Sequence, residues 1–246
     1  MREAFTYMFK DNKFYQKYFT YLGLAFAAYF LINYAYLFTA EGAQTYTNQI
    51  SFIPTNPFKS WGLLILGLTF KILTAGYFLN TIAAISKQND NYILPFFNTT
   101  NCLTKGLKLL GALLFIIFCF TILLFLSAGF KPLTLTLILI FSIIFCACFL
   151  WIIANENKYL VLLHIEDAVN YIKKASKNYF KYLFVFISAF VVSTSLSLLA
   201  ELFVSKFNAP RLEIIAISII YAIIDAYFIY VYSFLIAKSI KPESVV

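Results

Sequence analysis

The chain has 246 residues, of which 62% are hydrophobic and 12% are charged, and its formal net charge is +8. A soluble protein carries charge on about a quarter of its residues, so this composition leaves too few polar side chains to cover a surface that faces water. The basic residues lie in short segments between apolar blocks, which argues against nucleic-acid binding and for a membrane protein oriented by its positive charges.

Six apolar blocks are long enough to cross the roughly 30 Å hydrocarbon layer of a bilayer as helices. Helices are expected because strands with open edges would leave backbone groups unpaired in lipid. The sequence therefore predicts an all-α membrane bundle with six transmembrane helices, in a single membrane domain that covers residues 1–246. The predicted spans are residues 18–38, 61–85, 106–128, 133–154, 182–203 and 212–236.

Lysine and arginine are distributed unevenly between the connections that join these spans. With six crossings, 14 of these residues fall on the side that holds both termini and 4 fall on the opposite side. Basic residues concentrate in cytoplasmic loops. We therefore expect a multi-pass protein of the bacterial plasma membrane whose amino and carboxyl termini are both cytoplasmic.

Two segments on the predicted cytoplasmic side have the pattern of helices that lie in the membrane interface. Residues 161–177 place apolar side chains at helical spacing, and residues 4–18 mix aromatic with basic side chains. Basic residues beside aromatic ones suit a negatively charged lipid surface. The expected partners are the anionic inner leaflet and other membrane proteins, and no nucleic acid is expected.

The same two segments align without a gap at an offset of 164 residues, and a weaker third copy lies at an offset of 88. This pattern predicts three parallel units, each an interfacial segment followed by a helix hairpin. The alternative is convergence, because any span entered from the cytoplasm favours Lys and Tyr at its start. The matched residues are Ala4, Tyr7, Lys10, Lys13, Tyr15, Lys17 and Tyr18 with Ala168, Tyr171, Lys174, Lys177, Tyr179, Lys181 and Tyr182, and at the weaker offset Lys17, Leu22 and Gly23 with Lys105, Leu110 and Gly111.

Two charged residues lie deep inside predicted spans, Lys71 in the second and Asp225 in the sixth. Charges inside a bilayer are rare and usually face the interior of the bundle. Counted from the outer end of each span, the two residues lie roughly 15 and 20 Å deep, a difference that a lysine stem can bridge. We therefore expect Lys71 and Asp225 to pair, because pairing offsets most of the cost of an ion in lipid. Ser218 and Tyr221, near Asp225 in the sixth span, are the candidates for lining a polar path.

Two interpretations of this pair are open. The pair is either a neutralised contact that fixes the register of two helices or part of a proton or ion relay. No further carboxylate or histidine lies deep in the predicted spans to extend a relay, which favours the contact.

The first half of the chain carries several short motifs. They consist of Phe9, Asp11 and Lys17 before the first span, Gly76 and Tyr77 in the second, and Leu94, Pro95, Lys105, Gly106 and Lys108 before the third. These motifs resemble a family of uncharacterised prokaryotic multi-spanning membrane proteins, domain of unknown function 4013. In that family acidic residues usually follow the Leu-Pro pair, whereas Phe96, Phe97 and Asn98 follow it here. The resemblance implies a multi-spanning membrane architecture and supplies no catalytic residues.

The sequence contains no familiar catalytic motif: no G-x-S-x-G, no H-E-x-x-H and no phosphate-binding loop. The single histidine, His164, and the four cysteines lack the spacing of metal ligands, so we expect no enzyme, no metal and no cofactor. The expected function is that of a non-enzymatic membrane component that organises lipids or partner proteins. The alternative is a small transporter or permease-like subunit that uses the Lys71 and Asp225 pair, with Gly62 and Gly76 as positions where a span could break.

Overall fold

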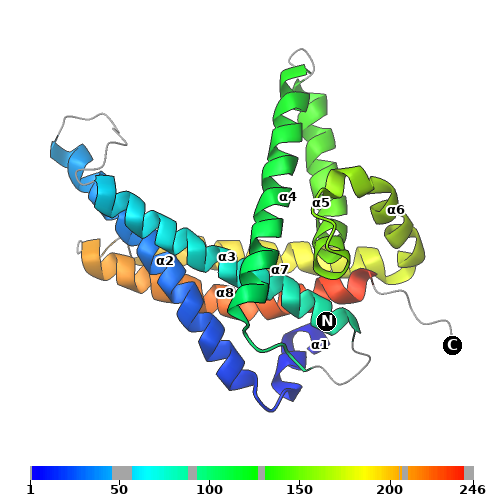
Figure 1. Ribbon diagram of the computed structural model, residues 1–246, viewed down its shortest axis with the longest axis horizontal. Helices are drawn as coiled ribbons and strands as arrows, with labels where there is room; N and C mark the ends of the chain where they lie inside the picture. Colours follow the sequence, from blue (N-terminus) through cyan, green and yellow to red (C-terminus); the bar gives the residue numbers. More distant parts are fainter. Residues whose placement is uncertain are drawn as a thin grey trace.

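The computed structural model describes residues 2–45, 57–87, 93–126, 131–204, 206 and 210–240. Among these residues all regular secondary structure is helical, and six long helices form three antiparallel hairpins, α2–α3, α4–α5 and α7–α8 (Figure 1). Short helical segments precede the first and third hairpins. The elements are α1 (Arg2–Thr6), the 3-10 helix η1 (Tyr7–Lys10), α2 (Phe14–Thr45), α3 (Pro57–Lys87), α4 (Thr99–Leu126), α5 (Lys131–Glu156), the 3-10 helix η3 (Val161–His164), α6 (Ile165–Lys174), α7 (Ser176–Val204) and α8 (Pro210–Ile240).

The six long helices are each long and apolar enough to cross a bilayer, which confirms the predicted number of spans and indicates a multi-pass membrane protein. Each helix begins before its predicted span, because polar residues at a helix end can stay helical outside the hydrocarbon. α4 begins at Thr99 rather than residue 106, since the side chain of Asn98 accepts a hydrogen bond from the Asn101 amide at 3.0 Å and caps the helix. Residues 127–128 of the third predicted span lie outside the described residues.

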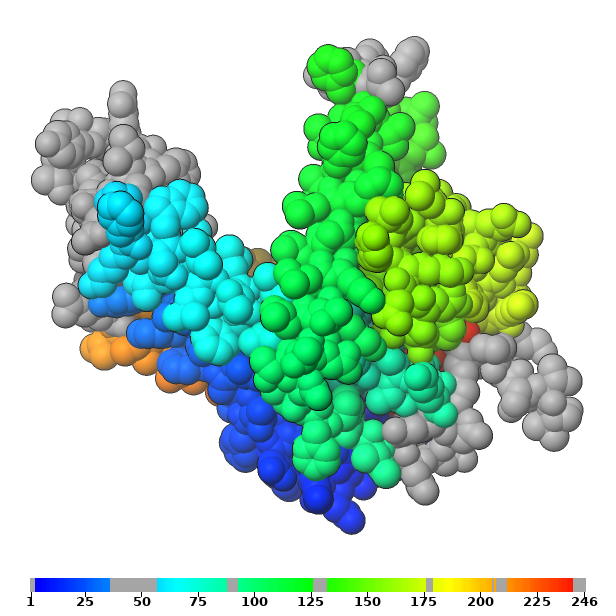
Figure 2. Space-filling view, in the orientation of Figure 1, coloured from blue at the N-terminus to red at the C-terminus, as the bar shows by residue number. Residues whose placement is uncertain are grey.

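The three hairpins are splayed rather than parallel. α8 packs against α2, α3 and α7, whereas the α4–α5 hairpin stands at a steep angle to α7 and α8 and packs mainly on α3 (Figure 1). Figure 2 shows the molecule hollowed between the first half of α3 and the α4–α5 hairpin. The far end of this hairpin therefore exposes apolar side chains such as Leu114, Phe118 and Leu137, a surface suited to lipid.

The ends of the hairpins converge on a region that we call the base, formed by α1, η1, residues 93–98 and the adjoining ends of α2, α3, α4 and α8. A buried ion pair holds it together: Lys17 Nζ lies 2.7 Å from Asp11 Oδ2, and the exposed fractions of the two side chains are 2% and 5%. Asp11 Oδ2 also accepts a hydrogen bond from the Leu94 amide at 2.8 Å, and Lys17 donates one to the Leu94 carbonyl at 2.5 Å. These bonds fasten residues 93–98 to the start of α2.

The carboxyl group of Asp11 stays charged despite its burial. Desolvation acts to raise the pKa of Asp11, but hydrogen bonds from the Lys17 ammonium and from the Lys13 and Leu94 amides outweigh it and lower the pKa. A buried pair is tolerated when such additional hydrogen bonds satisfy its atoms. The Asp11–Lys17 pair meets this condition.

Tyrosines fill the rest of the base. The Tyr7 hydroxyl donates to the Tyr230 carbonyl at 2.9 Å, and the Tyr77 hydroxyl donates to the Pro95 carbonyl at 3.0 Å. Ala4, Tyr7 and Met8 are fully buried, and Tyr7 packs on α8. Residues 4–18 are therefore divided between α1, η1 and the start of α2, and Phe9 and Tyr15 are exposed whereas Tyr7 and Met8 lie in the core. Their position in the membrane interface stays a prediction.

The second expected interfacial helix, residues 161–177, is divided into η3, α6 and the start of α7. α6 is strongly amphipathic, with Ala168 buried and Glu166 exposed. Lys158 joins this segment to the end of α5, because its ammonium lies 2.8 Å from Asp167 and 3.0 Å from Glu156. The amphipathic helix is therefore shorter than expected: it covers Ile165–Lys174 rather than residues 161–177.

Residues matched by the predicted repeat have different surroundings in the two segments. Lys17 is buried and Lys181 is exposed, whereas Tyr15 is exposed and Tyr179 is buried. The two segments therefore do not use the shared Lys and Tyr positions in the same way. The threefold repeat stays a prediction.

α3 runs without a break through Gly62 and Gly76, so neither glycine interrupts the span. Gly76 instead allows α4 to approach: a Cβ atom there would lie 1.7 Å from the Cys102 carbonyl oxygen. Gly106 makes the reciprocal contact, since its Cβ would lie 2.0 Å from the Ile72 carbonyl oxygen. Small residues at such a crossing let two backbones come together.

We expect Gly76→Ala and Gly106→Ala each to destabilise the protein by about 1–3 kcal/mol, because the added methyl group meets backbone that cannot rotate away. Gly111→Ala is the matched control on α4, because a Cβ atom there meets nothing within 4 Å. Alanine favours a helix over glycine by about 0.5–1 kcal/mol, so the control should be neutral or stabilised. Thermal unfolding in detergent measures the three changes, and equal stability of all three variants would contradict the close crossing.

Candidate functional site

The two deep charges lie near the middle of their helices and are in contact. Lys71 is the 15th of the 31 residues of α3, and Asp225 is the 16th of the 31 residues of α8. Each is therefore roughly 20 Å from either end of its helix. The structure places Lys71 Nζ 3.0 Å from Asp225 Oδ2, so the pair joins the second and sixth spans.

Two tyrosines of α2 complete this cluster. The Tyr29 hydroxyl accepts a hydrogen bond from Lys71 Nζ at 2.7 Å and donates one to Asp225 Oδ2 at 3.2 Å. The Tyr21 hydroxyl donates to the same oxygen at 3.4 Å, and the Lys71 ammonium lies 3.9 Å from the centre of the Tyr29 ring. The cluster is electrically neutral when both ions are charged, and it joins α2, α3 and α8.

A groove of about 420 Å³ lies beside this cluster, between α7 and α8. Asp225 and Tyr221 of α8 line it, Ser193 and Ser197 line it from α7, and Tyr29 lines it from α2. The exposed fractions of the Lys71 and Asp225 side chains are 39% and 28%, so the pair is not sealed within protein. The groove thus brings an open face of a charged cluster to the middle of a membrane-spanning region.

Only one of the two residues expected to line a polar path lines the groove. Tyr221 lines the groove, and its hydroxyl donates a hydrogen bond to Glu201 Oε2 at 3.1 Å. Ser218 is fully buried and accepts a hydrogen bond from Asn33 Nδ2 of α2 at 3.2 Å. Ser218 is not among the described residues that line the groove.

Sequence reasoning missed the tyrosines of α2 and the serines of α7. Tyr21 and Tyr29 are eight residues apart, which places them on one side of a helix, and Ser193 and Ser197 are four residues apart in an apolar span. Polar residues at helical spacing inside an apolar block are a signal of a shared polar face. That signal was present, but Tyr is so frequent at the ends of the spans that it was not distinctive.

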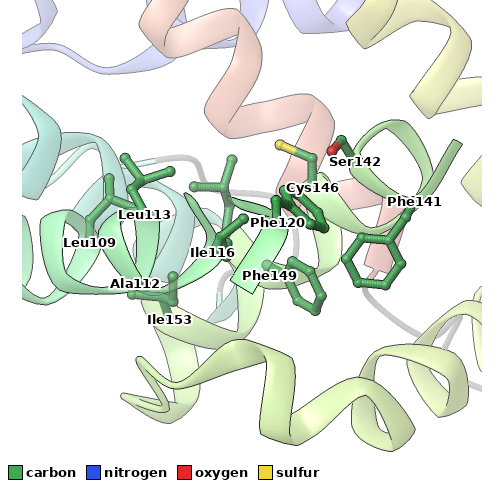
Figure 3. A pocket seen from close by; sticks show the side chains of 11 residues that line it. Leu109, Ala112, Leu113, Ile116, Phe120, Phe141, Ser142, Cys146, Phe149 and Ile153 are labelled. Atoms are coloured by element: carbon green, nitrogen blue, oxygen red, sulfur yellow. The ribbon is translucent and has the colours of Figure 1, made fainter. Parts of the chain in front are cut away.

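A second cavity, of about 200 Å³, lies between α4 and α5. Figure 3 shows that Phe120, Phe141 and Phe149 surround it together with aliphatic side chains. Ser142 and Cys146 are its most polar lining residues, and no Asp, Glu, Lys, Arg or His is among the described residues that line it. This cavity suits an apolar chain and offers no chemistry, so the groove at Asp225 is the candidate site.

The described residues contain no group of three or more His, Cys, Asp or Glu side chains that could hold a metal ion. His164 Nδ1 lies 3.4 Å from Asp167 Oδ2 in the exposed segment after α5 and takes no part in the groove. The chemistry that the groove offers is therefore that of one carboxylate, several hydroxyl groups and aromatic rings.

We expect Lys71→Ala and Asp225→Ala each to lower the amount of folded protein in the membrane, because each leaves one uncompensated ion among apolar helices. The double variant should recover part of this loss, since it removes both ions together. Membrane abundance and thermal stability of the three variants measure the effect. Losses that simply add in the double variant would contradict a direct interaction.

Comparison with family models, with curated proteins and with solved structures found no match to this chain. No function can therefore be transferred to this chain from a similar protein. The groove, its carboxylate and its position in the spans are the observations on which a function can be argued.

Proposed function

We propose that this protein is a non-enzymatic, multi-pass membrane component that organises lipids by holding an amphipathic molecule in the groove between α7 and α8. The observation that carries the proposal is a largely apolar groove that contains a carboxylate and several hydroxyl groups beside the Lys71–Asp225 pair, halfway along two membrane-spanning helices. An exposed ion pair at that depth is costly in hydrocarbon. A bound molecule with a polar head lowers this cost.

The size and the access of the groove support this proposal. Its volume of about 420 Å³ falls within the roughly 300–1,000 Å³ typical of small-molecule sites. α2 and α7 both pack on α8, but among the described residues they form no substantial interface with each other. We infer that the groove opens sideways between α2 and α7, where a molecule dissolved in the bilayer could enter without crossing water.

A transporter or permease-like subunit is the second candidate. Glu201, close to the end of α7, accepts a hydrogen bond from the hydroxyl of Tyr221, which lines the groove. These two polar side chains connect that end of α7 with the groove. This arrangement resembles part of a path across the membrane. The uninterrupted α3 and α8 argue against it, because transporter sites are commonly built from broken helices.

Filling the groove tests the lipid-binding proposal. We expect Ser197→Trp to reduce co-purifying or added amphipathic ligand at least about tenfold, because an indole ring occupies space between α7 and α8. Leu199→Trp is the matched control, since Leu199 is exposed on the same helix and does not line the groove. Native mass spectrometry from detergent measures retained lipid.

Equal retention in Ser197→Trp, Leu199→Trp and the unmodified protein would contradict the proposal. Protein reconstituted in vesicles separates the two candidate functions. A lipid-organising component binds a labelled amphiphile without moving it across the bilayer, whereas a transporter accumulates it on the far side with time.

We further propose that the protein lies in a bacterial plasma membrane with both termini in the cytoplasm. The supporting observations are the 14 to 4 distribution of basic residues and the even number of candidate spans. A fluorescent protein that folds only in the cytoplasm should be bright when fused to either terminus, and a phosphatase that folds only outside should be inactive there. An active phosphatase at either end would contradict this orientation.

A further inference from the structure

Aromatic rings and a single carboxylate dominate the chemistry of the groove. Asp225 is the one ionisable acid among the described lining residues, and no lysine, arginine or histidine is among them. The rings come from α2, α7 and α8, so three elements bring aromatic side chains to the groove that the carboxylate lines. The aromatic lining residues are Tyr29, Phe190, Tyr221, Phe228 and Tyr232.

Of the two oxygens of the Asp225 carboxylate, only Oδ2 accepts hydrogen bonds from described residues. Among the described residues, Lys71, Tyr21 and Tyr29 all donate to Oδ2. No described residue donates to Oδ1, and the carboxylate is partly exposed where it lines the groove. Oδ1 is therefore an acceptor that a ligand can reach.

We propose that the groove recognises an ammonium group, primary or quaternary, at the head of an amphipathic molecule. This inference rests on the proposed function and names the ligand class for the same site. The positive head lies against Asp225 Oδ1 and the faces of the surrounding aromatic rings, which attract cations through their negative ring faces. The apolar tail leaves sideways between α2 and α7 along lipid.

The lining discriminates against the opposite charge. An anionic head would face the Asp225 carboxylate and find no basic side chain among the described lining residues. The nearest ammonium, Lys71, is already hydrogen-bonded to Asp225 Oδ2 and to the Tyr29 hydroxyl. A neutral head gains contacts with hydroxyl groups but neither the ion pair nor the attraction to the rings.

Lys71 acts as an internal competitor for the same carboxylate. Its ammonium, 3.0 Å from Oδ2, neutralises part of the charge that a ligand would meet at Oδ1. Removing Lys71 should therefore strengthen the binding of an ammonium head, whereas removing the Asp225 charge should abolish the preference for it. The two halves of one ion pair thus have opposite predicted effects on binding.

The test uses three amphiphiles with the same ten-carbon chain and different heads: decyltrimethylammonium, decyl sulfate and decyl maltoside. Binding to the full-length protein in a neutral detergent is measured by native mass spectrometry and by the ligand-induced shift of the unfolding temperature. We expect the ammonium amphiphile to bind at least about tenfold more tightly than either of the others.

Variants at the ion pair give the decisive comparison. Asp225→Asn should lose the tenfold preference, and Lys71→Gln should increase it. Glu213→Gln is the matched control, because it removes one negative charge from the same helix at a residue that does not line the groove.

Tyr221→Leu tests the aromatic lining and does not alter the ion pair. Removing this ring should weaken binding of the ammonium amphiphile and leave binding of decyl sulfate unaffected. This variant provides the test if an ion-pair variant fails to fold.

Three results would contradict, in turn, ammonium recognition, the proposed function and the role of Lys71. Equal binding of the three amphiphiles, or an unchanged preference in Asp225→Asn, overturns ammonium recognition and leaves lipid binding in place. No binding of any amphiphile to the unmodified protein overturns the proposed function itself. Weaker ammonium binding in folded Lys71→Gln overturns the role of Lys71 as a competitor.

Discussion

One carboxylate oxygen, Asp225 Oδ2, holds the central part of the structure together. It accepts hydrogen bonds from Lys71 of α3 and from Tyr21 and Tyr29 of α2, so three helices meet at one atom in the middle of their length. In hydrocarbon these polar groups have few other partners, and separating the helices would leave each of them unsatisfied. The groove follows from this arrangement, because Asp225 faces both the α2–α3 hairpin and the side of α8 on which α7 packs.

The base supplies the second constraint. The Asp11–Lys17 pair and the Gly76–Gly106 crossing fix α2, α3 and α4 to one another at one end, whereas the far part of α4–α5 is exposed. Motif residues that are far apart in the sequence meet in this region: Leu94 bonds to both members of the ion pair, and Tyr77 bonds to Pro95. Several of the short motifs of the first half of the chain thus determine how one end of the hairpins is packed.

The number of helices could be predicted from the sequence because each span must satisfy its own backbone hydrogen bonds and be apolar over about 20 residues. The contact between Lys71 and Asp225 could also be anticipated, since depth along a helix is a simple function of residue number. The splay of the hairpins could not be anticipated, because it depends on which residues pack at the Gly76 crossing. The same limit applies to residues 4–18, whose apolar side chains suit a lipid surface and a protein core equally well, and to Ser218, whose burial depends on where α2 lies.

The Lys17–Asp11 and Lys71–Asp225 ion pairs differ in a way that bears on function. In the Lys17–Asp11 pair the exposed fractions are 2% and 5%, and each partner also forms a hydrogen bond with the Leu94 backbone, as expected for a contact that only joins elements. The Lys71–Asp225 pair lies at greater depth in the spans, where exposure costs more, yet its exposed fractions are 39% and 28%. A purely structural pair at that depth would gain from being sealed in the same manner. Asp225, which lines the groove, is the partner that a bound molecule can reach, and this open face is the observation that supports the proposed polar occupant.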